Sequence, residues 1–383
     1  MTKIRVLQFS SHDEDCGVGK YQEQFVKILQ KEKGEIETKF FDSSPYKTRI
    51  MSPSELDEVM ARLAKELASY DILHIQHEFG LYSSDEFKRL VDTAKELGKK
   101  VIVTAHTSPD FAFQYTRPGG VSLRSVLHVV RQKRRHEAFK VNHIEPMKRA
   151  DAIIVHNQST RNSLLRYGIA EDKIVMFTHP VPDHTNPLVS TEIATHLNKQ
   201  PGDIIYATVG FLHRYKGIAD AIKALNYLPS NYKLAIIGGM HPTSDEVSFY
   251  NDITDLINEQ GLRDRVYITG FIKDDDRLNS LLRETDVCVY AYDRVYYASV
   301  SSGSLNLAFS NEKPVVAYPT DSFKEMNTDG QIVLTQTFAY YELARSLKAL
   351  NVAKQTETVK KYAKKMSWTN ATKELVTIYE KVV

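Results

Sequence analysis

Short apolar runs alternate with helical patterns along most of the chain, and this alternation limits the fold more than any other feature. In the first half, polar or glycine-containing turns follow four runs that are typical of buried strands: IRVLQF (4–9), DILHIQ (71–76), KVIVTA (100–105) and DAIIVH (151–156). Between them, stretches such as SELDEVMARLAKELASY place apolar residues three and four positions apart, as amphipathic helices do. This alternation predicts βαβ units and a parallel sheet.

A proline-rich segment divides the chain. THPVPDHTNP (178–187) breaks the alternation and is the best candidate for a linker. Five further strand-like runs follow it: IIYATVG (204–210), YKLAIIGG (232–239), RVYITGF (265–271), DVCVYAY (286–292) and PVVAY (314–318). A chain of 383 residues is also too long for one hydrophobic core. We therefore predict an α/β protein of two Rossmann-like domains, each a doubly wound parallel sheet.

The composition excludes several classes of protein. Hydrophobic residues make up 42% and charged residues 26%, as in globular chains, and a net charge of +2 gives no global attraction for nucleic acid. The two cysteines, Cys16 and Cys288, are far apart, which favours a reducing compartment. The N-terminal apolar run is too short for a signal peptide, and no stretch reaches the roughly 20 apolar residues of a membrane span. We expect a soluble, cytoplasmic protein, and peripheral contact with the inner face of a membrane stays open.

The turns after the predicted strands hold the candidate functional residues. Ligands of open parallel sheets bind beyond the carboxyl ends of the strands. Here those ends lead into CGVGKY, QHEFG and HTSPD in the first half, and into FLHRYKG, GMHP and SVSSGS in the second. Both domains thus present Gly, His, Ser, Arg and Lys at the same kind of edge, which predicts a site in a cleft between the two.

The turn CGVGKY resembles a phosphate-binding loop only in part. A nucleotide-triphosphate loop requires Ser or Thr after its lysine, and here Tyr21 follows Lys20; Gln22 stands where a dinucleotide-binding turn has its third glycine. Gly17 and Gly19 still open a helix whose free N–H groups suit an anion. The alternative is a tight turn that needs glycine for its backbone alone.

The turn GFLHRYKG (210–217) carries Arg214 and Lys216 at a strand end. Arg with its paired N–H groups and Lys as a point charge can hold a diphosphate, although such pairs are often solvated loop charges. SVSSGS (299–304) is a Ser/Gly turn at a helix start, which also suits phosphate but offers no acid or base.

Histidines follow two strands of the first half. HIQHE (74–78) lacks the HExxH order of metalloproteases and no cysteine cluster is near, so we expect no metal site. His106 ends VIVTAH and could donate to a sugar hydroxyl or carry a proton, although a lone histidine at a strand end is often structural.

The segment SLRSVLHVVRQKRRHEAFK (122–140) is the one strongly charged local patch of the sequence. It has an apolar stripe followed by cations: Leu123, Val126, Leu127 and Val130, then Arg131, Lys133, Arg134 and Arg135. Such a helix can lie on an anionic membrane or follow a phosphate backbone, or it can be an ordinary helix with one wet face.

The order of these motifs resembles a known family. The Gly-rich first turn is followed by IQHEFG, VTAHT, ADAIIVHNQSTRNSLL, HPVPD, VGFLHRYKGI, IIGGMHP, VYITGF, SSGSLNLAFSNEKPVVA and SWTNATKELVTIYEKV. The chain is similar to retaining nucleotide-sugar glycosyltransferases of the GT-B fold (group 1), above all to those that build bacterial glycans and glycolipids. The resemblance implies an acceptor-side domain (1–183), a donor domain (184–365) facing it across a cleft, and a C-terminal helix (366–383) that crosses back to the first domain.

The resemblance also implies roles for residues. Lys216, Arg214 and His106 would be catalytic, Lys216 and Arg214 on the donor diphosphate and His106 facing the transferred sugar. The diphosphate would also contact the glycine and serine turns, and the nucleoside and acceptor sides would be lined by further residues. These are Gly17, Gly19, Ser301, Ser302, Gly303 and Ser304 for the diphosphate, Gly239, Phe271, Ile272 and Asn306 for the nucleoside, and His77 and Glu78 for the acceptor.

The sequence departs from the family pattern at one place. Many members have two glutamates with seven residues between them near the Ser/Gly turn, and the second glutamate holds the ribose; Ser299 and Leu307 stand at these positions instead. We expect a metal-independent, cofactor-free hexosyl- or pentosyltransferase that moves a sugar from a nucleotide diphosphate, with UDP favoured, to a hydroxyl of a glycolipid or surface polysaccharide. The alternatives are an enzyme acting on modified DNA and a non-catalytic protein that binds sugar nucleotides or glycans. The oligomeric state stays open.

Overall fold

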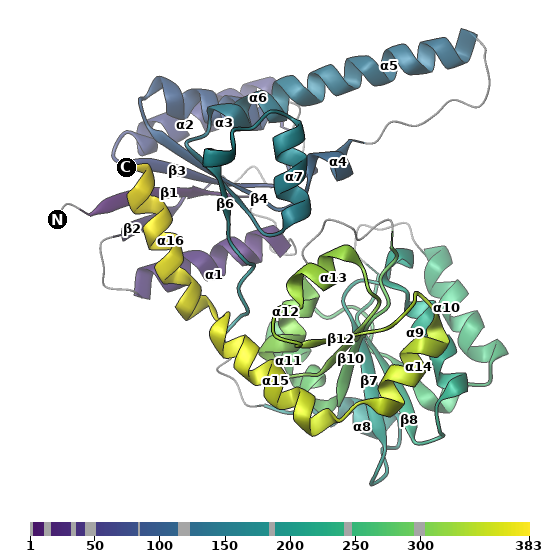
Figure 1. Cartoon of the computed structure of the whole chain (residues 1–383). Coiled ribbons are helices and arrows are strands. Elements are labelled where there is room, and N and C mark those ends of the chain that lie inside the picture. Colours follow the sequence, from purple (N-terminus) through teal and green to yellow (C-terminus); the bar gives the residue numbers. More distant parts are fainter. Residues whose placement is uncertain are drawn as a thin grey trace. The chain divides into compact units, whose positions relative to one another are not determined.

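The computed structural model describes residues 3–10, 17–31, 36–42, 51–82, 85–113, 123–183, 188–240, 247–294 and 303–383. These residues form two compact units. The first unit contains the chain up to His179 and again from Trp368 to Val383, and the second contains most of the chain from Pro180 to Ser367 (Figure 1).

The first unit is built on a six-stranded sheet in the order β2-β1-β3-β4-β5-β6, in which every pair is parallel. The strands are β1 (Ile4–Phe9), β2 (Ile36–Phe40), β3 (Ile72–His77), β4 (Lys100–Ala105), β5 (Ala152–Val155) and β6 (Ile174–Met176). In the sheet, β2 lies on one side of β1 and β3 lies on the other, so the direction of strand addition reverses at β1. Such a reversal opens a crevice at the carboxyl ends of the strands.

Helices cover both faces of this sheet. They are α1 (Gly17–Lys31), α2 (Pro53–Leu67), α3 (Glu86–Glu96), α4 (Pro109–Ala112), α5 (Leu123–Phe139), α6 (Glu145–Arg149), α7 (Gln158–Arg166) and α16 (Trp368–Val382), with a π-helical turn (Lys140–Ile144) after α5. Neighbouring residues of one strand face opposite sides, so Leu7 belongs to the core under α2 and α3, and Val6 to the core under α1 and α16.

Buried polar bonds join α16 to the first sheet. The Tyr379 hydroxyl accepts a hydrogen bond of 3.0 Å from Gln8 Nε2 and lies 2.8 Å from His74 Nδ1. His74 Nε2 lies 2.8 Å from the hydroxyl of Thr104 on β4. Burial lowers the pKa of His74 to about 3, so the imidazole is neutral at pH 7. The network pairs groups that would otherwise be buried without partners.

The second unit repeats the architecture with the strand order β12-β11-β10-β7-β8-β9, again with every pair parallel. The strands are β7 (Ile204–Val209), β8 (Tyr232–Ile237), β9 (Val266–Ile268), β10 (Val287–Tyr290), β11 (Val315–Ala317) and β12 (Ile332–Leu334). The helices are α8 (Glu192–His196), α9 (Ile218–Ala224), α10 (Val247–Glu259), α11 (Asp275–Glu284), α12 (Gly303–Ser310), α13 (Asp321–Met326), α14 (Tyr340–Ala349) and α15 (Val352–Lys365), and a 3₁₀ turn η3 (Arg214–Lys216) precedes α9.

The chain enters and leaves the second unit at neighbouring points. The Val181 N–H donates a 2.8 Å hydrogen bond to the Met366 carbonyl, and Val181 pairs with Ser367 in a parallel bridge. The second unit is therefore an insertion between β6 and α16 of the first.

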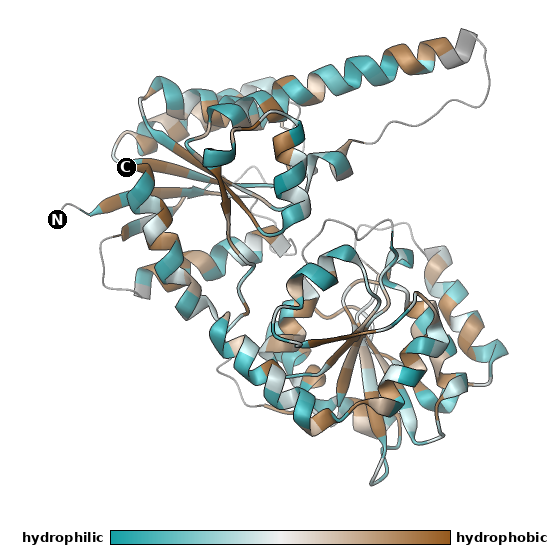
Figure 2. Cartoon of the chain, in the orientation of Figure 1, coloured by the Kyte–Doolittle hydropathy of each residue, from teal (hydrophilic) through white to brown (hydrophobic). Residues whose placement is uncertain are grey.

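The predicted pair of Rossmann-like α/β units is confirmed. In Figure 2 the hydrophobic strands form the centre of each unit. The sequence patterns missed β2, β6 and β12, which lie at sheet edges and are partly exposed, so they lack a continuous apolar run. Among the helices of the described ranges, none is both long and apolar enough to cross a bilayer.

Candidate functional site

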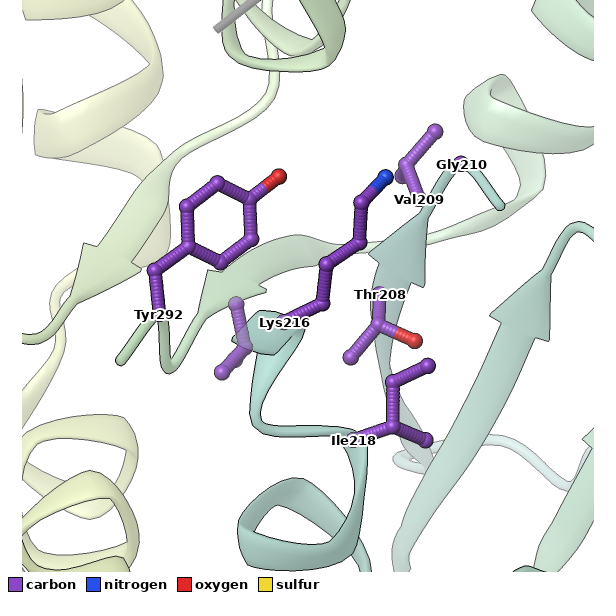
Figure 3. A pocket seen from close by; sticks show the side chains of 7 residues that line it. Thr208, Val209, Gly210, Lys216, Ile218 and Tyr292 are labelled. Atoms are coloured by element: carbon purple, nitrogen blue, oxygen red, sulfur yellow. The ribbon is translucent and has the colours of Figure 1, made fainter. Parts of the chain in front are cut away.

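A small recess lies at the carboxyl end of β7 in the second unit. Its empty volume, which includes open solvent, is about 200 Å3. Figure 3 shows the Lys216 side chain running along it with the ammonium beside Gly210. The recess is lined by Thr208, Val209, Gly210, Lys216, Ile218, Val289 and Tyr292. β7 has its neighbours β8 and β10 on opposite sides, so the recess occupies the switch point of the second sheet.

Two glycines give Lys216 its position. Gly210 has φ +108°, which L side chains rarely adopt, and a Cβ there would lie 2.4 Å from Lys216 Nζ, so a side chain would force the ammonium to move. Gly217, directly after η3, has φ +63°, and a Cβ there would lie 1.9 Å from the Ala291 carbonyl oxygen. Glycine at both positions therefore lets the turn pack against the end of β10 and lets Lys216 reach over β7.

The Lys216 ammonium is available to a ligand. Within the described ranges it has neither a carboxylate nor another hydrogen-bond acceptor as partner. Burial without a compensating charge lowers its pKa from 10.5 to about 8. An anion in the recess would supply the missing partner and favour the charged form.

The first turn of α12 lies on the other side of Gly210. The Cβ of Ser304 is 3.9 Å from the position that a Gly210 Cβ would take. The Ser304 hydroxyl lies 3.0 Å from the Tyr292 hydroxyl, and Tyr290 donates a 2.6 Å hydrogen bond to the Ser304 carbonyl. The structure thus brings together Lys216 and the helix start with Gly303 and Ser304, as an anion site requires. Ser301 and Ser302 lie outside the described residues.

Arg214 does not line the recess. Its guanidinium donates a 2.5 Å hydrogen bond to Asp252 on α10, lies 5.0 Å from the centre of the Phe249 ring, and is 62% exposed. The expected partnership of Arg214 with Lys216 is absent from this arrangement, because the side chain is held by α10 and its charge is balanced there.

The turns after β7, β8 and β9 approach one another closely. A Cβ at Gly239 would lie 2.3 Å from the Phe271 backbone nitrogen, so only glycine permits the contact. The rings of Phe211 and Phe271 stack with centroids 5.8 Å apart, and Phe271 is 38% exposed. Ile272 beside it is partly buried, whereas Asn306 on α12 is only 1% exposed. Gly239, Phe271 and Ile272 therefore lie together at this edge, and the Asn306 side chain is in the interior.

The first unit holds the other predicted residues. Gly17 and Gly19 lie in the first turn of α1, and the space beside Gly17 is open. His106 follows β4, and its Nε2 donates a 2.9 Å hydrogen bond to Gln76 Oε1, which leaves Nδ1 as an acceptor. Burial and the neighbouring imidazole of His156 hold the pKa of His106 well below its usual value. His106 is therefore neutral at pH 7 and can serve as a hydrogen-bonding group.

His77 is the last residue of β3 and Glu78 follows it, and the two side chains face different surroundings. The partly buried Glu78 carboxylate accepts a hydrogen bond from the Thr107 hydroxyl, and burial raises its pKa. The His77 side chain is fully buried, lies 3.1 Å from His143, and packs against Phe87. The interior position of His77 does not offer the acceptor contact that the sequence predicts.

Comparison with known protein families assigns both halves of the chain. Residues 29–184 match the model of Glycosyltransferase Family 4, and residues 189–366 match that of Glycosyl transferases group 1. The chain belongs to the group 1 glycosyltransferases. No curated protein sequence matches this glycosyltransferase significantly.

Solved structures share the fold of this glycosyltransferase. HepE from Anabaena in complex with UDP has a TM-score of 0.70 at 14% identity, covering 99% of this chain and 100% of that one. Sucrose-phosphate synthase from Thermosynechococcus elongatus has a TM-score of 0.69 at 16% identity, covering 99% of each chain. WaaG, a glycosyltransferase involved in lipopolysaccharide biosynthesis, has a TM-score of 0.63 at 14% identity, covering 98% and 99%. The GT-B fold predicted for the chain is confirmed.

Sequence patterns missed Gly210, Gly217 and Tyr292 of the glycosyltransferase recess. The signal for the glycines is their place on either side of FLHRYK, directly after a strand and before a helix. Tyr292 ends the run DVCVYAY and gave no comparable signal. Among the residues described, no group of three or more His, Cys, Asp or Glu side chains could hold a metal ion.

Proposed function

We propose that the chain is a retaining glycosyltransferase that moves a sugar from a UDP-sugar to an acceptor hydroxyl without a metal ion or other cofactor. The observation that carries the proposal is the Lys216 ammonium, which has no acceptor among the described residues and lies at the switch point of the second sheet. The family match supports glycosyl transfer, and the UDP complex of the structurally similar HepE supports the choice of nucleotide.

The proposed chemistry depends on the leaving group. When the bond between the sugar and the diphosphate breaks, negative charge grows on the diphosphate oxygens. Lys216 and the N–H groups at the start of α12 would hold that charge in a partly dry recess, where fixed charges and dipoles act strongly. The catalytic demand on the second unit is therefore electrostatic stabilisation, which needs no acid or base in the Ser/Gly turn.

The nucleoside would occupy the edge next to the recess. Gly239 and the backbone at Phe271 and Ile272 would contact the base, and the exposed Phe271 ring offers an apolar surface beside them. Leu307 stands where many relatives have the ribose-binding glutamate, and Asn306 is in the interior. We therefore assign the ribose hydroxyls to backbone groups of these turns.

The first unit would bind the acceptor and face the transferred sugar with His106. The Nδ1 of His106 is an acceptor in this tautomer and would accept a hydrogen bond from a sugar hydroxyl. Glu78, with a raised pKa, is the candidate for contact with the acceptor hydroxyl. The proposed acceptor is a glycolipid or a surface polysaccharide, because relatives such as WaaG are involved in lipopolysaccharide biosynthesis.

A thermal-shift screen with a panel of nucleotide sugars tests the donor assignment, since a ligand raises the melting temperature by mass action. We expect UDP-sugars to stabilise the wild type and to have much less effect on Lys216→Ala. Lys348→Ala, an exposed lysine on α14 of the same unit, is the matched control and should respond as the wild type does. An unchanged shift in Lys216→Ala would remove that residue from the donor site.

Donor turnover separates the enzyme from a binding protein of the same fold. The missing glutamates at Ser299 and Leu307 favour the second candidate, a non-catalytic protein that binds sugar nucleotides. Hydrolysis or transfer of the stabilising UDP-sugar, followed by NMR of the product anomer, would identify a retaining enzyme. Tight binding without turnover across a panel of lipid, polysaccharide and modified-DNA acceptors would establish the binding protein instead.

A further inference from the structure

Helix α5 is an arm that leaves the body of the first unit. In Figure 1 its Phe139 end lies at the unit and its Leu123 end lies far from it. The ring of His136 packs against Phe113 and that of Phe139 against Phe79, and the following π-helical turn buries Ile144. These contacts fix the arm at its C-terminal end.

The outer half of the arm exposes apolar side chains. Val126 is 56% exposed, Leu127 51%, Val129 40% and Val130 41%. Val126, Leu127 and Val130 share one face of the helix. β-branched residues are weak helix formers, and a helix without tertiary contacts is marginal in water. The exposed apolar face therefore indicates that this segment has a binding partner.

The half nearer the unit exposes cations. Arg131, Lys133, Arg134 and Arg135 are all exposed, and none forms an ion pair with a described residue. Other arginines of the first unit do pair, as Arg149 does with Asp92.

The α5 sequence itself has a single acid, Glu137, which pairs with Lys140 at 3.0 Å. Among the described residues, the four cations thus lack the ion-pair partners that neighbouring surface arginines have.

The apolar half and the cationic half of α5 together favour one kind of partner. A nucleic acid would use the cations and leave the apolar half in water. A second copy of α5 would bring arginines close to arginines, at an electrostatic cost. An anionic bilayer satisfies both halves, because its hydrocarbon accepts the apolar side chains and its headgroups the cations.

Distances along the helix agree with this partner. From Val126 to Arg131 the helix rises by about 7.5 Å, at about 1.5 Å for each residue. If the arm enters the interface with its Leu123 end first, that rise matches the roughly 5–10 Å depth to which interfacial helices bury apolar side chains. We propose that α5 docks the protein on an anionic lipid membrane, with Val126, Leu127, Val129 and Val130 in the acyl boundary and Arg131 to Arg135 among the headgroups. The proposal is independent of the glycosyltransferase assignment.

Vesicle co-sedimentation of the full chain tests the proposal. We expect the wild type to pellet with vesicles of phosphatidylcholine and phosphatidylglycerol at low salt, and to bind pure phosphatidylcholine or high-salt mixtures far less. Replacing Arg131, Arg134 and Arg135 by alanine should lower the partition coefficient about 100-fold, at about fivefold for each cation. Val126→Asp with Leu127→Asp should lower it at least about tenfold.

Matched variants of the second unit control for charge and hydrophobicity. Lys354, Lys361 and Lys364 are exposed on α15, and their triple alanine variant should bind vesicles as the wild type does. Leu188 and Val189 are 63% and 62% exposed, and their double aspartate variant should also be unchanged. Because the α5 side chains are exposed, their variants should keep the melting temperature of the wild type.

Three results would overturn the proposal. The first is vesicle binding that the Val126 and Leu127 changes leave intact. The second is a wild-type protein that does not bind vesicles but shifts duplex DNA in gels, with a shift that the triple arginine variant loses. The third is a dimer in sedimentation velocity that the same apolar changes convert to a monomer while vesicle binding is absent.

Discussion

The affinity of the protein for UDP should fall as the pH rises through about 8. In the proposed function the recess binds the diphosphate through Lys216, whose pKa burial lowers from 10.5 to about 8. Only the protonated ammonium attracts a diphosphate, so binding is strong below that pKa and is lost above it. The lowered pKa of Lys216 sets the pH range near 8 over which the affinity falls, because an ordinary lysine would stay charged up to about pH 10.

The size of the effect follows from the same pKa. At pH 7 about nine tenths of the free protein carries the charged lysine, and at pH 9 about one tenth does. If the neutral form binds weakly, the apparent Kd should increase about tenfold between these pH values, or about 1.4 kcal/mol. The diphosphate should also raise the pKa of Lys216 in the complex, so binding takes up protons in this range.

Isothermal titration with UDP between pH 6.5 and 9.5 measures both the affinity and the proton uptake. Lys216→Gln should bind more weakly, with an affinity that depends little on pH, because this side chain cannot titrate. Any dependence of the Kd on pH that remains in this variant comes from the nucleotide or from other groups and can be subtracted. A wild-type Kd that changes less than about twofold, equal to the change in Lys216→Gln, would refute the placement of the lysine.

Three further outcomes follow from the packing. Lys216→Met should raise the free energy of unfolding at pH 7, by at most about 3 kcal/mol, because it removes an uncompensated buried charge. A urea titration at pH 7 that shows no increase in the variant would contradict the burial. In the wild type, unfolding binds protons between about pH 8 and 10.5, so the free energy of unfolding rises with pH there. Tyr379→Phe should cost about 1–3 kcal/mol in the same assay, because His74 and Gln8 lose a buried partner, whereas Tyr341→Phe, 50% exposed, should be neutral. Gly217→Ala should lower the melting temperature and weaken UDP binding, since its Cβ would meet Ala291. Gly98 also has a positive φ but has open space beside it, so Gly98→Ala is the control. An equal fall of the melting temperature in both variants would show that the positive φ, and not the contact with Ala291, causes the effect.

The sequence was sufficient to predict the architecture because buried parallel strands are nearly continuous apolar runs. Edge strands such as β2 alternate buried and exposed residues over a short length, and this pattern is too weak to detect. The same reasoning found Lys216, because a lysine in a turn directly after a buried strand must lie at the ligand edge of the sheet.

The partners of individual side chains could not be predicted from the sequence. Arg214 and Lys216 differ by two positions, yet one meets Asp252 on α10 and the other meets no acceptor in the described part of the chain. That difference depends on how a distant helix packs. His77 also ends a strand as expected, but the neighbouring helices bury its ring against Phe87. A strand-end position thus predicts the edge, and only tertiary packing decides whether the side chain faces a ligand.

The insertion of the second unit between β6 and α16 has a consequence for biosynthesis. The core under α1 includes Trp368, Leu375, Ile378 and Tyr379, which follow the whole second unit in the sequence. During translation the α1 side of the first sheet therefore lacks α16 until the second unit has been synthesised. The second unit lies wholly within 180–367 and has its own core, so it can fold earlier. This glycosyltransferase should therefore complete its N-terminal unit last, and a chain truncated before Trp368 should expose the Tyr21 and Phe25 side of that unit to chaperones and proteases.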